Sequence, residues 1–111
     1  MIAKKYRIPS NRIALIKAKG GESLTQLFIV RHMDSKEEYS RYCVIVSLKI
    51  SKKAVERNQL KRQTFEAIRT LIKEKGELKN IKDLIFIPKK QILNKNFQEI
   101  KDDINQFLWK N

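Results

Sequence analysis

Residues 47–62, with the sequence SLKISKKAVERNQLKR, mark the point at which a strand pattern changes into a helix pattern. Over 39–50 the apolar side chains alternate, which predicts a strand. Over 52–75 they recur at helical spacing, which predicts a long helix that Ser51 caps and Gly76 ends. The last fourteen residues of the junction contain six basic residues and one acid. The chain therefore carries a strongly basic turn between a strand and its longest helix.

One face of the predicted long helix changes from basic to apolar along its length. At about 100° per residue, the core-facing arc contains Leu60, Thr64, Phe65, Ile68, Leu71 and Ile72. Nearer the N-terminus the same arc meets Lys53, Arg57 and Lys61. Burying these cations unpaired would cost several kcal/mol, so we expect the first two turns to extend beyond the core. These cations could simply form a charged, solvated helix face. The free backbone N–H groups and the positive dipole end of a helix N-terminus favour an anion-binding surface instead.

The remaining patterns predict an α+β fold in the order α-β-β-α-β-α, with helices packed against a central sheet. The other expected elements are a basic helix over 11–19 that ends at Gly20, strands over 24–32 and 83–87, and a helix over 97–108 that Asn96 and Glu99 begin as a capping box. The short polar loop between strands 24–32 and 39–50 predicts an antiparallel pair. Strand 83–87 is apolar on both faces, so we expect it at the centre of the sheet. We expect residues 1–111 to form a single domain.

The composition points to a nucleic-acid partner. The chain has 111 residues and a formal net charge of +13, which indicates a polyanion as the binding partner. The first nineteen residues contribute six basic residues and no acid. No apolar run approaches the roughly 20 residues that span a bilayer, and no signal-peptide pattern opens the chain. We therefore expect a cytoplasmic protein with no membrane partner.

The sequence contains no recognisable catalytic constellation. Cys43 is the only cysteine and His32 the only histidine, which excludes an intrachain disulfide and the zinc motifs built on histidine pairs. These two residues could in principle form a nucleophilic pair, but no third orienting group is identifiable. Asp102 and Asp103 are adjacent on a predicted helix and point about 100° apart, which suits a paired metal site badly. We expect no catalytic residue and no metal-binding residue in the protein itself.

The basic junction resembles the signature of the bacterial ribonuclease P protein subunit. That family has Ser-Lys-Lys, a short spacer and then Arg-Asn-Arg-x-Lys-Arg where a strand leads into a helix. The matching positions here are Ser47, Lys49, Arg57, Asn58, Lys61 and Arg62. Leu48 and Gln59 replace basic residues of the family pattern, and Lys52 and Lys53 are nearby cations that can compensate. Glu66-Ala67-Ile68-Arg69, and an apolar strand between Asp83 and Lys89, continue the resemblance.

The resemblance implies a small basic cofactor of a ribozyme. In that family an RNA subunit with bound Mg²⁺ removes the 5′ leader of precursor tRNA by hydrolysis, so the protein is the non-catalytic subunit of a ribonucleoprotein endoribonuclease. The implied partners are ribonuclease P RNA and precursor tRNA, with no obligate protein partner. The protein alone is expected to bind no cofactor, because the Mg²⁺ belongs with the RNA subunit. The implied fold resembles that of ribosomal protein S5 domain 2, with a left-handed βαβ crossover.

The resemblance also assigns residues to two RNA contacts. The residues expected to bind the catalytic RNA are Ser47, Lys49, Lys52, Lys53, Arg57, Asn58, Lys61, Arg62 and Arg69. A cleft between the N-terminal helix and the sheet is expected to hold the leader, with Arg12, Ile13, Lys17, Arg31 and Lys89 as its candidates. The family often has aromatic residues where Ile13, Lys17 and Arg31 stand, so leader binding here should depend more on charge than on stacking.

Two other classes of function stay open. One is a ribosomal or other structural RNA-binding protein with no role in cleavage, which the Arg-Asn-x-x-Lys-Arg helix entry disfavours. The other is a stand-alone nuclease, which the missing metal or histidine cluster disfavours.

Overall fold

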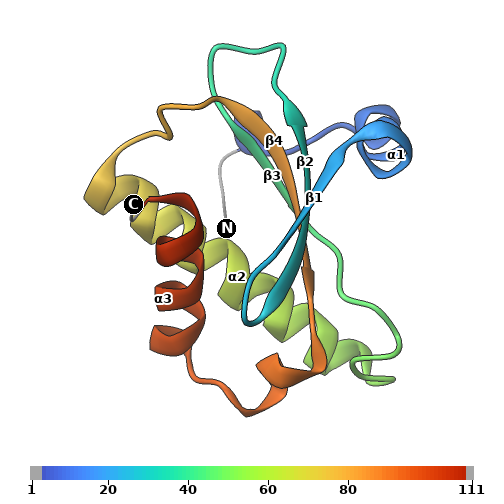
Figure 1. Cartoon of the computed structure of the whole chain (residues 1–111). Coiled ribbons are helices and arrows are strands. Elements are labelled where there is room, and N and C mark those ends of the chain that lie inside the picture. Colours follow the sequence, from blue (N-terminus) through green and yellow to red (C-terminus); the bar gives the residue numbers. More distant parts are fainter. Residues whose placement is uncertain (1–3, 110–111) are drawn as a thin grey trace.

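In a computed structural model, which describes residues 4–109, four strands form one mixed sheet with helices on both faces (Figure 1). The helix α1 (Ser10–Lys19) covers one face, and α2 (Ala54–Lys75) and α3 (Phe97–Leu108) cover the other. The strands are β1 (Gly21–Leu24), β2 (Phe28–Asp34), β3 (Arg41–Val44) and β4 (Lys82–Pro88), and two short 3₁₀ helices are η1 (Lys4–Tyr6) and η2 (Lys90–Asn94). The α+β class is confirmed, with one strand more than the sequence patterns indicate.

The strand order in the sheet is β1-β2-β4-β3. β4 pairs antiparallel with β2 and parallel with β3, so β3, α2 and β4 form a βαβ unit. The expected antiparallel pair of strands 24–32 and 39–50 is therefore wrong, because β4 lies between them. The expected central place of strand 83–87 is confirmed. Because β4 occupies this place, β2 and β3 cannot pair with each other. Leu84, Ile85 and Phe86 are all buried, and a strand that is apolar on both faces is covered fully only in the middle of a sheet.

The expected strand over 24–32 is confirmed only in its second part, where residues 28–32 belong to β2, while residues 25–27 form the turn of a hairpin that joins β1 to β2. The Thr25 hydroxyl accepts the N–H of Phe28 at 2.9 Å, and the N–H of Thr25 donates to the Phe28 carbonyl. Asp103 of α3 accepts the N–H of Leu27 at 3.1 Å and the Thr25 hydroxyl at 2.7 Å. A carboxylate from a distant helix thus stabilises a turn that contains neither glycine nor proline, the residues that usually signal one.

The expected strand over 39–50 is shorter in the structure. β3 ends at Val44, because its ladder with β4 runs only from Arg41 to Val44, and residues 48–50 form a turn. The expected N-cap at Ser51 is wrong. α2 begins at Ala54 after Lys53, and the Ser51 hydroxyl instead accepts the N–H of Lys53 at 3.1 Å. The chain therefore makes an additional turn before the helix begins.

The main core lies between the sheet and the two larger helices. The residues of α2 that it buries are Leu60, Thr64, Phe65, Ala67, Ile68 and Leu71, which confirms the apolar stripe and its start at Leu60. Asn96 accepts the N–H of Glu99 and the Glu99 side chain accepts the N–H of Asn96, which confirms the capping box of α3. None of the helices in the described part of the chain has both the length and the apolar character needed to cross a membrane.

Candidate nucleic-acid interface

The basic junction, residues 47–62, folds into an ordered turn followed by the first turns of α2. The Ser47 hydroxyl accepts the N–H of Lys49 at 3.0 Å, and Arg57 Nη1 donates to the Ser51 carbonyl at 3.0 Å. The Ser51 hydroxyl also hydrogen-bonds Glu56, the one acid of the junction. Ser47, Ser51 and Arg57 are half-buried. These polar contacts hold the turn and leave the lysines free to bind a partner.

Five of the six cations of the junction face solvent. The exposed side chains are Lys49, Lys52, Lys53, Asn58, Lys61 and Arg62. Within residues 4–109, none of these five cations takes part in an ion pair. The expectation that the cations of the first turns extend beyond the core is confirmed for Lys53 and Lys61, while Arg57 is half-buried against the Ser51 carbonyl. Unpaired exposed cations beside a helix N-terminus form a surface suited to phosphate.

Arg69 lies further along α2 and differs from the junction cations. Its Nη2 pairs with Glu66 Oε1 at 2.5 Å, one helical turn away, and both side chains are partly exposed. The hydrogen bond from Arg69 lowers the pKa of Glu66, so the pair is ionised at neutral pH. Arg69 lies on the same helix as Arg57, Asn58, Lys61 and Arg62, but its charge is already partly balanced.

An ion-pair cluster joins α1 to the centre of the sheet. Asp83 of β4 accepts Arg12 Nε at 2.9 Å, and its two oxygens accept Arg41 Nε and Nη2 at 2.9 and 2.8 Å. The Asp83 side chain is fully buried, and Arg12 and Arg41 are only 10% and 13% exposed. Burial alone would raise the pKa of Asp83, but the hydrogen bonds from Arg41 and Arg12 outweigh it and lower the pKa. This cluster positions α1.

Two more of the expected leader residues also make contacts within the fold. Arg31 Nη2 donates to the carbonyls of Lys17 and Gly20 at 2.8 and 3.1 Å, at the C-terminal end of α1, where a cation is favoured by the helix dipole. Lys89 Nζ donates to the Thr25 carbonyl at 2.6 Å. Together with Arg12, three of the five expected leader residues therefore hold the fold together. Of the four expected cations, Lys17 is the exposed one, and it makes no ion pair within residues 4–109.

A small apolar cluster lies between α1 and the sheet. Ile8, Ile16 and Ile85 are buried in it, and the half-buried side chains around them are Ile13, Met33, Cys43, Ile45 and Ile87. Ile13 thus belongs to this cluster, as a leader-cleft residue would. The sequence analysis missed Met33, Ile45 and Ile87, although the alternation of Cys43 with Ile45 and of Ile85 with Ile87 would identify them once β3 and β4 were known to be neighbours.

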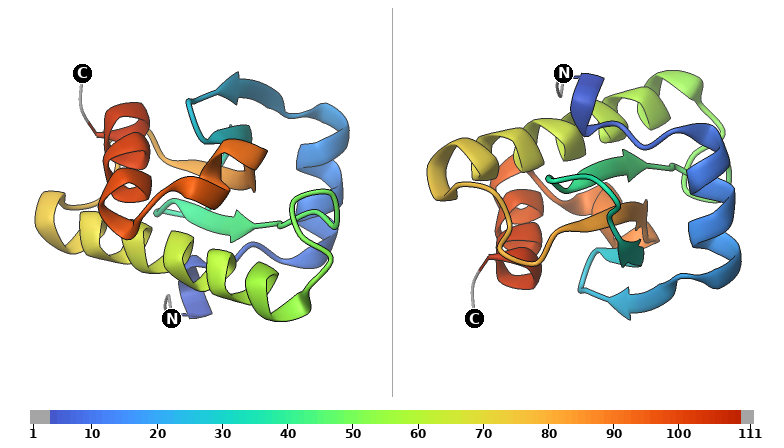
Figure 2. Two further views of the ribbon diagram at one scale, coloured as in Figure 1. Left: turned by 90° about the horizontal axis from the view of Figure 1, so that it is seen from below. Right: turned by 90° about the horizontal axis from the view of Figure 1, so that it is seen from above.

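Cys43 connects the apolar cluster to both basic segments. Burial raises the pKa of its thiol, while the charges of Lys61 on α2 and Lys17 on α1 act in the opposite direction. Figure 2 shows the loop from β3 to α2 on the same side of the molecule as α1 in both of its views. The two basic segments flank one partly apolar surface.

The structure excludes a nucleophilic pair of Cys43 and His32. The two residues lie on β3 and β2, with β4 between them, and Cys43 packs on the α1 face of the sheet. His32 Nε2 instead shares a hydrogen bond with Ser23 Oγ at 3.1 Å. Within residues 4–109, no cluster of three or more His, Cys, Asp or Glu side chains is arranged to hold a metal ion.

Comparisons with known proteins agree with the resemblance at the junction. The model of the family described as Ribonuclease P matches residues 3–111. A ribonuclease P protein component of Bacillus cereus (strain 03BB102) is 32% identical over 103 residues, which cover 91% of this chain and 86% of that protein. A ribonuclease P protein component of Pseudanabaena sp. (strain PCC 6903) is 34% identical over 98 residues, with 87% and 82% covered.

Solved structures show the same fold. The RNase P protein from Thermotoga maritima superimposes with a TM-score of 0.79 at 24% identity, over 95% of this chain and 96% of that one. A mutant Staphylococcus aureus RNase P protein, described as defective in mRNA degradation activity, gives a TM-score of 0.75 at 30% identity, with 93% and 85% covered. The likeness therefore extends over nearly the whole chain.

Proposed function

This chain belongs to the ribonuclease P protein family, and we propose that it binds both the catalytic RNA and the 5′ leader of precursor tRNA. Family membership makes it a component of an endoribonuclease holoenzyme with ribonuclease P RNA as its partner. The observation that supports the finer proposal is the position of the unpaired cations. The exposed lysines of the junction and Lys17 of α1 flank one partly apolar surface around Cys43.

The protein acts by electrostatics and by positioning. The catalytic RNA and its substrate are both polyanions and repel each other, and a protein of charge +13 between them lowers that repulsion. Mg²⁺ held by the RNA subunit supplies the hydrolytic chemistry. Because the protein lowers the repulsion that Mg²⁺ would otherwise have to screen, less Mg²⁺ is needed when the protein is bound. The protein contributes no catalytic residue. This role belongs in the cytoplasm.

The two RNA contacts divide between two parts of the molecule. The basic junction binds structured RNA through Lys49, Lys52, Lys53, Arg57, Asn58, Lys61 and Arg62. The surface between α1 and the sheet guides the leader, with Lys17 on the phosphates and the half-buried Ile13, Met33 and Ile45 under the bases. Contacts to phosphate and sugar carry little sequence information, so the protein should accept leaders of many sequences.

A reconstitution experiment tests the proposal. The protein is mixed with a bacterial ribonuclease P RNA at low Mg²⁺, and cleavage of precursor tRNA is measured. We expect the protein to increase the rate and to cleave nothing by itself. No stimulation, with tight binding to ribosomal RNA instead, would identify a structural RNA-binding protein. Cleavage by the protein alone in EDTA would identify a nuclease and overturn the ribozyme-cofactor role.

A further inference from the structure

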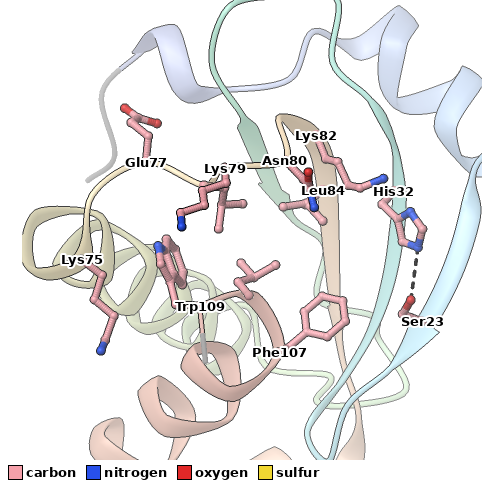
Figure 3. Close-up of a pocket in the computed structure, with 12 residues that line it drawn as sticks. Ser23, His32, Lys75, Glu77, Lys79, Asn80, Lys82, Leu84, Phe107 and Trp109 are labelled. Atoms are coloured by element: carbon pink, nitrogen blue, oxygen red, sulfur yellow. Dashed lines mark hydrogen bonds between the residues drawn. The ribbon is translucent and has the colours of Figure 1, made fainter. Parts of the chain in front are cut away.

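A cavity of about 640 Å³ lies on the face of the sheet that α2 and α3 cover, opposite α1 (Figure 3). The end of α2 and the loop after it supply one side, the end of α3 supplies the floor, and β1 and β2 supply the far side. Its volume falls in the range of about 300–1,000 Å³ that is typical of small-ligand sites. The proposed RNA contacts around α1 and the basic junction do not use it.

One end of the cavity combines an aromatic ring with free cations. Trp109 is half-buried, and its indole Nε1 donates to the Gly76 carbonyl at 3.0 Å, which fixes the ring. Lys75 and Lys79 are exposed, and neither makes an ion pair within residues 4–109. The one carboxylate of the lining, Glu77, accepts a hydrogen bond from Tyr6 and points away from Trp109 (Figure 3). This end is positively charged and presents an aromatic surface.

The opposite end is polar, and its one cation, Lys82, is already paired with a carboxylate. His32 and Ser23 form a hydrogen-bonded pair there, across the cavity from Lys75 (Figure 3). Burial and the charges of Lys82 and Arg31 lower the pKa of His32, so its imidazole is neutral at pH 7. Lys82 is itself paired with Asp34 at 3.2 Å. A ligand in this cavity therefore meets cations at one end and hydrogen-bonding groups at the other.

We propose that this cavity binds one unpaired nucleotide of an RNA strand, with its base against Trp109 and its phosphate on Lys75 and Lys79. A planar base stacks on an indole, and an adjacent phosphate suits two unpaired lysines. The His32–Ser23 pair can hydrogen-bond the sugar or the edge of the base. An apolar ligand would leave the lysines without a partner, and an inorganic anion would leave the ring without one. The inference rests on the proposed RNA-binding function for the choice of RNA as the source of the nucleotide.

The chain's single tryptophan makes the test direct, because its emission reports on this cavity alone. The probes are a short single-stranded oligouridylate, uridine monophosphate and inorganic phosphate. We expect saturable quenching by the oligouridylate and by the mononucleotide, and none by phosphate. The double variant Lys75→Ala/Lys79→Ala should weaken oligouridylate binding about tenfold or more and reduce its log-salt slope by about 0.7 for each lost contact. Lys73→Ala, an exposed lysine on the same helix outside the cavity, is the matched control and should behave as wild type.

Three outcomes would overturn the inference. The first is a tryptophan emission that does not change with any of the probes, and the second is quenching by the oligouridylate that the double variant retains in full. The third is quenching by uridine monophosphate when the oligouridylate causes none. Stimulation of precursor-tRNA cleavage at low Mg²⁺ is measured separately on the same proteins. If the wild-type protein stimulates cleavage while its emission stays unchanged, the cavity inference fails and the proposed function stands. If stimulation is absent, the proposed function fails whatever the emission shows.

Discussion

Asp83 at the start of β4 accepts the Nε–H of Arg12 in α1 at 2.9 Å, across 71 positions of the chain. A carboxylate at the end of an inner strand thereby holds the N-terminal helix over the sheet face. The same carboxylate binds Arg41 of β3 through two hydrogen bonds. The surface proposed for the leader is therefore positioned by a buried ion-pair cluster as well as by the apolar contacts of Ile13 and Ile16.

Replacing Asp83 should destabilise the fold strongly. Asp83→Asn keeps the shape of the side chain but leaves two largely buried guanidinium groups without their counter-charge, which we expect to cost about 3 kcal/mol. Urea unfolding followed by circular dichroism measures the change. Glu66→Gln breaks an exposed ion pair with Arg69 and serves as the control, with almost no change expected. Equal midpoints for the two variants would contradict the structural role of Asp83.

The same carboxylate should make stability depend on pH in the acid range. The pKa of Asp83 lies below its ordinary value of 3.8 in the folded protein. A lowered pKa stabilises the fold above the unfolded pKa, and the contribution is lost as the pH falls through the folded pKa. Between about pH 5 and pH 2, the free energy of unfolding should fall more steeply for wild type than for Asp83→Asn. Parallel curves for the two proteins would show that Asp83 does not titrate in this way.

Arg57→Ala should weaken binding to ribonuclease P RNA. The change removes a cation of the junction and its hydrogen bond to the Ser51 carbonyl, so the turn that presents the lysines is also loosened. We expect about a tenfold loss of affinity and a log-salt slope that is smaller by about 0.9. Filter binding over a range of salt concentrations measures both. Lys73→Ala, on the same helix but outside the junction, should leave both unchanged, and an unaltered slope in Arg57→Ala would argue against a phosphate contact.

Variants of Lys17 and Arg31 should have different effects, the first on leader binding and the second on the stability of the fold. Lys17 is exposed and unpaired within the described residues, so Lys17→Ala should reduce holoenzyme affinity for precursor tRNA with a leader and leave thermal stability intact. Arg31→Ala removes the hydrogen bonds at the end of α1 and should cost about 1–2 kcal/mol of stability. Affinity for tRNA substrates with and without a leader, beside thermal melts, distinguishes the two. A stable Arg31→Ala protein with a specific leader defect would reverse these assignments.

Much of the local structure could be predicted because it depends on neighbouring residues. The stripe that begins at Leu60 and the capping box of Asn96 and Glu99 are set by spacing along one helix. The hairpin at Thr25 could not be predicted, because its turn depends on Asp103, which is 78 positions away. The basic junction could be recognised from the sequence because its residues are contiguous. The part that Arg12, Arg31 and Lys89 play in the fold could not, because each of them contacts residues far along the chain.

The sequence by itself determined where each helix and most strands form, where the positive charge gathers, and which family the basic junction resembles. These properties follow from periodicity, capping and composition, which act over a few residues. The tertiary structure alone decided that β4 separates β2 from β3, that Asp83 binds Arg12 and Arg41, and that Cys43 packs in the apolar cluster between α1 and the sheet. Which strands are buried and which buried charges pair depend on contacts between segments that are distant in the sequence. These contacts exist only in the folded chain.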